Sequence, residues 1–113
     1  MKPIVGLTEK IELIGPTSLN NKLVAKVDTG ATIGSIDIKL AAELQLGPII
    51  KTKRVKQAQG IATRAIVEAI IDFAGRKFKT TFTLADRSHM KYRVLIGQNQ
   101  MKGIMIDPAK KGW

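Results

Sequence analysis

The sequence predicts a mainly β domain with one or two short helices. Two observations lead to this fold class: apolar and polar residues alternate along most of the chain, as they do in half-buried strands, and turn residues separate these stretches. At 113 residues the chain is long enough for a real hydrophobic core but too short for two domains. We therefore expect residues 1–113 to form a single domain.

Two strands are predicted near the N-terminus. Residues 4–14 alternate in polarity, and residues 22–28 do so again after a turn cluster rich in Pro, Ser and Asn at residues 16–21. Because side chains alternate across a strand, we expect each stretch to turn one apolar face toward the core. That face consists of Val5, Leu7, Ile11 and Leu13 in the first strand and of Leu23, Ala25 and Val27 in the second.

A short helix is predicted after residue 34. Ser35 or Asp37 can cap its N-terminus, and Gly47-Pro48 ends it after about Leu46. The apolar residues at helical spacing are Ile36, Leu40 and Leu44.

A charged hairpin is predicted next. Residues 49–57 are extended in character but carry charge on both faces, which suits the edge of a sheet or a projecting hairpin with its tip at residues 57–60. These cations either form a solvated edge or, if the hairpin covers a cleft, contact a substrate. They are Lys51, Lys53, Arg54 and Lys56.

Three strands complete the prediction. From residue 64 to 73 the odd-numbered positions are apolar, and Ala74-Gly75 then makes a tight hairpin turn. After a loop at residues 86–91, residues 94–96 are apolar on both faces, which favours a strand in the middle of the domain. In the strand between them we expect Phe78, Phe82 and Leu84 to face the core and Lys77, Lys79, Thr81 and Thr83 to face outward.

Composition excludes several chemistries. The chain has no cysteine, which rules out disulfides, thiolate metal sites and cysteine nucleophiles. His89 is the only histidine, too few for an ordinary zinc site, and no glycine-rich phosphate loop ends in Lys-Ser or Lys-Thr. We therefore expect no metal and no cofactor, and we expect His89 to be a surface loop residue.

Charge is the second strong signal. Lys and Arg outnumber Asp and Glu by 19 to 9, which gives a formal net charge of +10. Such a field attracts polyanions, either a nucleic acid or an acidic peptide, although a merely solvated surface is also compatible with it. Because the chain has neither a membrane-length apolar run nor a signal-peptide segment, we expect a cytoplasmic protein that does not bind membranes.

One short stretch, Val27-Asp28-Thr29-Gly30-Ala31, carries the chemistry. Asp28 ends the second strand on the side opposite its apolar face, and Gly30 permits a tight turn and a close approach to the main chain. Either Asp28 is a catalytic acid, or it only caps the turn by Asx-type hydrogen bonds. The other acids have simpler roles: Asp37 caps a helix, Asp86 either caps a loop or pairs with Arg87, and Asp107 forms a turn before Pro108.

Further segments carry a resemblance to a known family. The Asp28 stretch is followed by Asp86-Arg87-Ser88-His89-Met90-Lys91-Tyr92, by Val94-Leu95-Ile96-Gly97 and by Ile106-Asp107-Pro108. In this order, over nearly the whole chain, they resemble the retropepsin-like aspartic peptidase family whose members are often called ATP-dependent zinc proteases. The chain departs from the family at Gln98, where Arg is frequent, and at Thr32-Ile33-Gly34, where a polar or basic pair is frequent.

The resemblance implies a single-lobe, retropepsin-like closed barrel that pairs about a two-fold axis as a homodimer. It also implies a metal-free mechanism in which the Asp28 carboxylates of two chains share a proton and activate water. Thr29 is expected to lock the catalytic loop across the pair, and the Gly30 amide to support the carboxylate. We further expect the substrate to contact Ala31, Lys56, Arg64 and Arg87.

The substrate and an alternative function follow from the same comparison. Members of the family are often associated with ligases that add glutamates to ribosomal protein tails, which implies an acidic or poly-glutamate substrate and accounts for the positive charge. The alternative is a non-catalytic binding module of the same fold that recognises an acidic tail or a nucleic acid. Nucleic acid is less favoured, because few aromatic residues are available to stack on bases: Phe73, Phe78, Phe82, Tyr92 and Trp113.

Overall fold

The computed structural model describes residues 2–16, 20–58 and 60–112. The strands are β1 (Ile4–Val5), β2 (Thr8–Ile14), β3 (Asn20–Val27), β4 (Gly34–Asp37), β5 (Ile49–Gln57), β6 (Gly60–Phe73), β7 (Arg76–Ala85), β8 (Val94–Ile96) and β9 (Met105–Ile106). The helical elements are α1 (Ile38–Glu43) and a short 3-10 helix, η1 (Gln98–Gln100).

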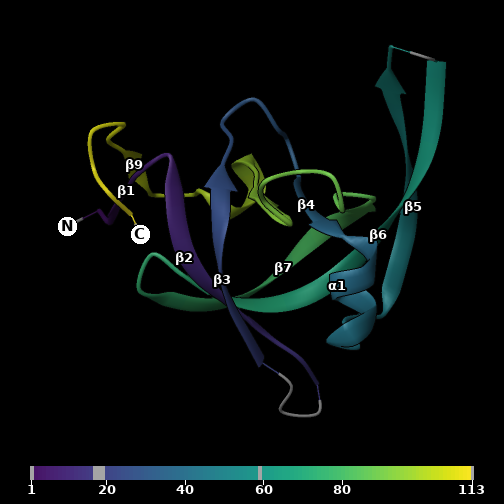
Figure 1. Ribbon diagram of the computed structural model, residues 1–113, viewed down its shortest axis with the longest axis horizontal. Helices are drawn as coiled ribbons and strands as arrows, with labels where there is room; N and C mark the ends of the chain where they lie inside the picture. The colour runs from purple at the N-terminus through teal and green to yellow at the C-terminus, as the bar shows by residue number, and fades with distance from the viewer. Residues whose placement is uncertain (1, 17–19, 59, 113) are drawn as a thin grey trace.

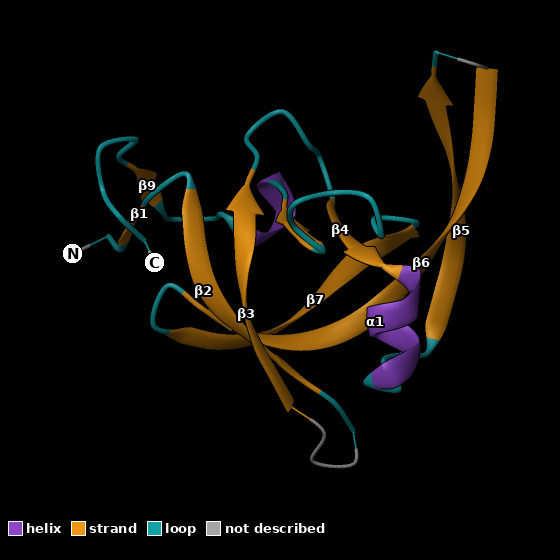
Figure 2. Cartoon of the chain, viewed as in Figure 1, coloured by secondary structure: helices purple, strands orange, loops and turns teal. Residues whose placement is uncertain are grey.

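In these residues, seven strands form one sheet in the order β2-β3-β8-β4-β7-β6-β5. Because β2 also pairs with β6, the first six strands of this order close into a barrel and β5 is left at the edge (Figure 1). Figure 2 shows how little helix accompanies the strands. The structure confirms the predicted mainly β class and the closed barrel.

The N-terminal stretch is not one continuous strand, and this part of the prediction is wrong. The chain breaks after Val5, and Leu7, predicted to be in the core, is 53% exposed. The cause lies in the C-terminal segment, which passes so close to Gly6 that any side chain there would collide with the Lys110 carbonyl. The buried Glu9 carboxylate accepts hydrogen bonds from the Gly6 N–H (3.1 Å) and Lys110 Nζ (2.8 Å). Of the predicted turn cluster, residues 17–19 lie outside the described residues.

The predicted helix is present but shorter, because a strand precedes it. Asp37 caps α1 by accepting a hydrogen bond from the Leu40 N–H (3.3 Å), whereas the other candidate cap, Ser35, lies in β4. The helix ends at Glu43, with Leu44 as its C-cap. The three residues predicted to be apolar contacts, Ile36, Leu40 and Leu44, all belong to the core.

The charged hairpin is confirmed as an edge element. β5 pairs only with β6 among the described strands, and the outer part of the hairpin projects beyond the barrel (Figure 1). Residue 59 of the predicted tip lies outside the described residues. At the other end of β6, Ala74 and Gly75 have φ of 56° and 75°, the left-handed conformations that a tight hairpin turn requires.

The core lies inside the barrel. Val94 and Ile96 are fully buried, which confirms that β8 is an inner strand between β3 and β4. Phe82 is buried as predicted, but Thr83, predicted to face outward, is only 9% exposed. Its hydroxyl donates to the Gly34 carbonyl (3.3 Å) on the neighbouring β4, so the buried polar group is satisfied. No helix among the described residues is both long enough and apolar enough to span a membrane.

Candidate active site

Asp28 lies where β3 leaves the barrel beside β8. These strands are parallel, with Val27 opposite Ile96, and the Asp28 N–H donates to the Ile96 carbonyl (2.9 Å). The Asp28 side chain is half-buried, and its Oδ1 accepts a hydrogen bond from the Gly30 N–H (2.9 Å). A turn-capping aspartate makes the same bond, so the role of Asp28 depends on what surrounds it.

The segment that follows β8 supports residues 28–33, the Asp28 loop, by close packing and backbone hydrogen bonds. A Cβ atom at Gly97 would lie 2.5 Å from both the Gly34 nitrogen and the Ile33 carbonyl carbon, so only glycine fits where the two segments cross. The backbone N–H of Gln98 donates to the Ala31 carbonyl (2.8 Å) and that of Asn99 to the Thr32 carbonyl (3.1 Å). The loop is therefore held by backbone bonds at two successive residues.

A cleft of about 360 Å³ separates the Asp28 loop from the charged hairpin. One wall consists of Ala31, Thr32 and Ile33, and β7 contributes Thr83. The hairpin contributes Lys53, Arg54, Lys56 and Arg64. No acidic side chain is among the described residues that line this cleft, so it presents positive charge to whatever enters it.

Three of the four residues predicted to contact substrate meet in this cleft: Ala31, Lys56 and Arg64. Arg64 is also anchored, because its Nη1 donates to the Leu84 carbonyl at 3.5 Å. Thr32, Ile33 and Thr83 line the same cleft but were not among the predicted site residues. No sequence motif marks these uncharged residues as part of a site. Thr83 reaches the cleft because β7 pairs with β4, a contact between segments that are distant in the sequence.

Arg87, the fourth predicted contact, does not line the cleft. Its Nε donates to the Tyr92 carbonyl (2.9 Å) and its N–H to Asp37 Oδ1 (2.9 Å). Burial holds the pKa of the Arg87 guanidinium below its ordinary value, although the carboxylates of Asp37 and Asp28 partly offset this effect. Arg87 is therefore near enough to Asp28 to interact with its charge. An ion pair with Asp86, the alternative considered from sequence, is not formed: the Asp86 carboxylate instead accepts from the Ser88 N–H (3.0 Å) and hydroxyl (2.6 Å).

Asp37 does more than cap the helix. Its side chain is 2% exposed, and besides the bond from Arg87 it pairs with Arg93 Nη2 at 3.1 Å. Burial alone would raise the pKa of Asp37, but the hydrogen bonds from Arg87, Arg93 and Leu40 together bring it below its ordinary value. Asp37 thus anchors the loop that carries Arg87, a role that spacing along the sequence did not reveal.

The remaining candidates have the simple positions expected of them. Asp107 Oδ1 accepts a hydrogen bond from the Ala109 N–H (2.9 Å) in a turn, and His89 is an exposed loop residue. Within the described part of the chain, no three His, Cys, Asp or Glu side chains lie close enough together to hold a metal ion.

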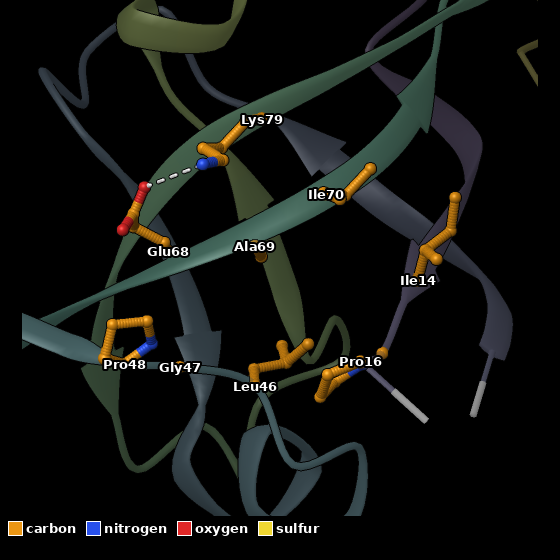
Figure 3. Close-up of a pocket in the computed structure, with 10 residues that line it drawn as sticks. Ile14, Pro16, Leu46, Gly47, Pro48, Glu68, Ala69, Ile70 and Lys79 are labelled. Atoms are coloured by element: carbon orange, nitrogen blue, oxygen red, sulfur yellow. Dashed lines mark ion pairs between the residues drawn. The ribbon is translucent and has the colours of Figure 1, made fainter. Parts of the chain in front are cut away.

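A second, smaller pocket of about 150 Å³ lies at the opposite end of β3 (Figure 3). Leu46, Pro48 and Ala69 are among the residues that line it, and the Glu68–Lys79 ion pair (3.8 Å) stands at its rim. β3 runs from this end to Asp28 over 8 residues, roughly 25 Å of extended chain. The pocket is therefore remote from the Asp28 loop.

Comparison with protein families gives a match over most of the chain. The model described as retropepsin-like aspartic endopeptidase RimB matches residues 39–112. The matched range begins after the Asp28 loop and does not include it. The position of Asp28 therefore rests on the contacts described above. A search of curated proteins gave no match.

Solved structures give the same fold. A Legionella pneumophila protein of unknown function has a TM-score of 0.66 and 21% identity, with 98% of this chain and 97% of that chain covered. The EIAV protease in complex with the inhibitor HBY-793 has a TM-score of 0.65 and 17% identity, over 90% of this chain and 86% of that one. The Simian Foamy Virus protease has a TM-score of 0.59 and 20% identity, over 84% and 91%. At these identities the likeness establishes a retropepsin-like fold.

Proposed function

Because the chain belongs to the RimB-like family of retropepsin-like aspartic endopeptidases, we propose that it is a homodimeric aspartic peptidase that cleaves acidic peptides, poly-glutamate chains in particular. The observation that carries this proposal is the position of the Asp28 loop beside a cleft lined by Lys53, Arg54, Lys56 and Arg64. Bonds between cations and carboxylates are stronger than neutral ones, and a concentrated positive field draws an acidic chain inward.

The need for two chains follows from the chemistry. Each chain supplies one Asp-Thr-Gly, whereas general acid–base hydrolysis of this type requires two carboxylates. Exposed apolar side chains in the N- and C-terminal segments, one of them beside the Asp28 loop, support pairing with a second copy. The Leu7 carbonyl accepts the Val27 N–H (2.9 Å), so Leu7 lies beside the end of β3. Ile4, three residues before Leu7 along the chain, pairs with Met105 between β1 and β9. Leu7, Ile4 and Met105 are 53%, 49% and 55% exposed.

In the proposed mechanism the two Asp28 carboxylates lie about 3 Å apart and share one proton, because like charges at that distance cannot both ionise. The ionised member takes a proton from water as the water attacks the peptide carbonyl carbon. The protonated member donates its proton to the carbonyl oxygen. Collapse of the resulting diol then transfers a proton to the leaving nitrogen and breaks the C–N bond.

The neighbouring residues have supporting roles in this proposal. The Gly30 N–H stabilises the ionised carboxylate through its bond to Oδ1 (2.9 Å). Thr29, which is exposed, would contact the partner chain across the two-fold axis. Ala31, Lys56 and Arg64 would bind the substrate in the cleft. Arg87, which is bonded to Asp37, would attract the acidic substrate by its positive charge.

The Asp28→Asn variant tests the proposal. It should abolish cleavage of poly-glutamate, by about a thousandfold or more, because asparagine can neither accept nor deliver the shared proton. Sedimentation should still show a dimer, and Asp107→Asn, which alters an exposed turn acid, should cleave like the unmodified chain. Full activity in Asp28→Asn would refute the mechanism. A wild-type dimer that binds poly-glutamate and cleaves nothing would identify a non-catalytic binding module instead.

A further inference from the structure

One side chain outside the predicted site contacts the Asp28 loop directly. Gln98, the first residue of η1, donates from Nε2 to the Thr29 carbonyl at 2.6 Å. Its backbone N–H is already bonded to the Ala31 carbonyl (2.8 Å). Because the backbone of Gln98 is already fixed in this way, only the rotamer freedom of its side chain is lost when it forms the bond.

The position of this bond matters because a peptide unit is planar. The Thr29 carbonyl and the Gly30 N–H belong to the same peptide plane. Gln98 Nε2 holds the carbonyl side of that plane, and Asp28 Oδ1 accepts the hydrogen bond from its N–H side (2.9 Å). A donor on the carbonyl fixes the tilt of the plane and also polarises the amide, which strengthens the bond that its N–H donates.

The two other amide side chains of η1 have different partners. Asn99 accepts from the Gly34 N–H (3.0 Å), and Gln100 accepts from the Gly97 N–H (2.9 Å). Both also donate to the Thr81 carbonyl, at 3.0 and 2.8 Å. These bonds attach η1 to β7 and β4, whereas the Gln98 side chain reaches the Asp28 turn itself.

We infer that Gln98 is a positioning residue for the Asp28 carboxylate, acting through the Thr29–Gly30 peptide. The inference rests on the proposed function for its consequence in catalysis, but the contact chain from Gln98 to Asp28 stands without it. Since the amide of Gln98 is neutral, it orients Asp28 without adding charge. Arg87, a cation that interacts with the Asp28 carboxylate, is altered in none of the variants below.

The test compares Gln98→Met, which keeps the length and removes the donor, with Lys102→Met, an exposed change just after the same helical turn. The readout is the hydrogen exchange rate of the Gly30 amide, measured by NMR. Gln98→Met should speed this exchange about fivefold, the ratio that one ordinary hydrogen bond produces, while the barrel amides stay unchanged. Lys102→Met should leave both unchanged.

Kinetics provide the second readout. Gln98→Met should lower kcat about tenfold with little change in KM, and should move the acid limb of the pH–rate profile upward, because a weakened Gly30 bond stabilises the ionised carboxylate less. An unchanged Gly30 exchange rate in Gln98→Met, or equal acceleration of every amide, would overturn the inference. If the wild-type protein cleaves nothing, the proposed function fails, and the Gly30 exchange rate still decides the role of Gln98.

Discussion

Asp37→Asn is expected to destabilise the fold by about 2–4 kcal/mol at pH 7. Asp37 Oδ1 accepts the Arg87 N–H, and Oδ2 accepts both the Leu40 N–H and Arg93 Nη2. Asparagine has one acceptor oxygen, so its NH₂ must face one of these donors. If the asparagine NH₂ faces the Arg87 N–H, that part-buried donor loses its acceptor, which costs about 1–3 kcal/mol of folding free energy. Loss of charge toward Arg93, which is 41% exposed, adds about 1 kcal/mol.

The stability that Asp37 contributes should decrease as the pH is lowered. The folded-state pKa of Asp37 lies below its ordinary 3.8, so its contribution is present above pH 3.8 and is lost as pH falls through the lower folded value. Urea unfolding followed by circular dichroism should therefore show the difference between wild type and Asp37→Asn shrinking below about pH 4. Glu43→Gln is the control, since Glu43 is exposed at the end of the same helix and should not shift the midpoint at pH 7. A variant within about 0.5 kcal/mol of wild type, or a difference unchanged at pH 3, would refute the reasoning.

Two further predictions concern the cleft and the pairing surface. The double variant Lys53→Gln/Lys56→Gln should raise KM for poly-glutamate about fivefold at low salt. At 0.5 M salt it should change KM little, because salt screens the attraction between exposed cations and the substrate. The control is the double variant Lys22→Gln/Lys102→Gln, which removes the same charge outside the cleft. An equal rise in KM in this control would contradict a role for the cleft. Leu7→Glu should shift the dimer toward monomer in sedimentation and reduce activity in proportion, since it places a charge in the proposed interface. A Leu7→Glu protein that sediments like wild type would exclude this surface.

The parts of the fold that could be predicted are those set by local pattern. The alternation of β6, the turn at Ala74-Gly75 and the doubly apolar β8 follow from periodicity and from the conformations that turns demand. The edge position of β5 follows from charge on both its faces. Each of these depends on residues close together in the sequence.

The parts that could not be predicted depend on contacts between distant segments. Leu7 is exposed because the C-terminal segment packs against Gly6, more than a hundred residues away. Thr83 is buried because β4 lies beside β7, and β4 itself is too short to show alternation. The Asp28 turn could be read from its own residues, whereas the bond from Gln98 depends on where β8 ends.

The central claim is that two chains each contribute one Asp28 to a single site. Mixing wild type with an equal amount of Asp28→Asn, after unfolding and joint refolding, tests it directly by the poly-glutamate cleavage rate per wild-type chain. If chains pair at random and both carboxylates are needed, that rate should fall to about half, because half of the wild-type chains then have an inactive partner. A rate per wild-type chain that does not change on mixing would show that one chain suffices, and would contradict the shared site.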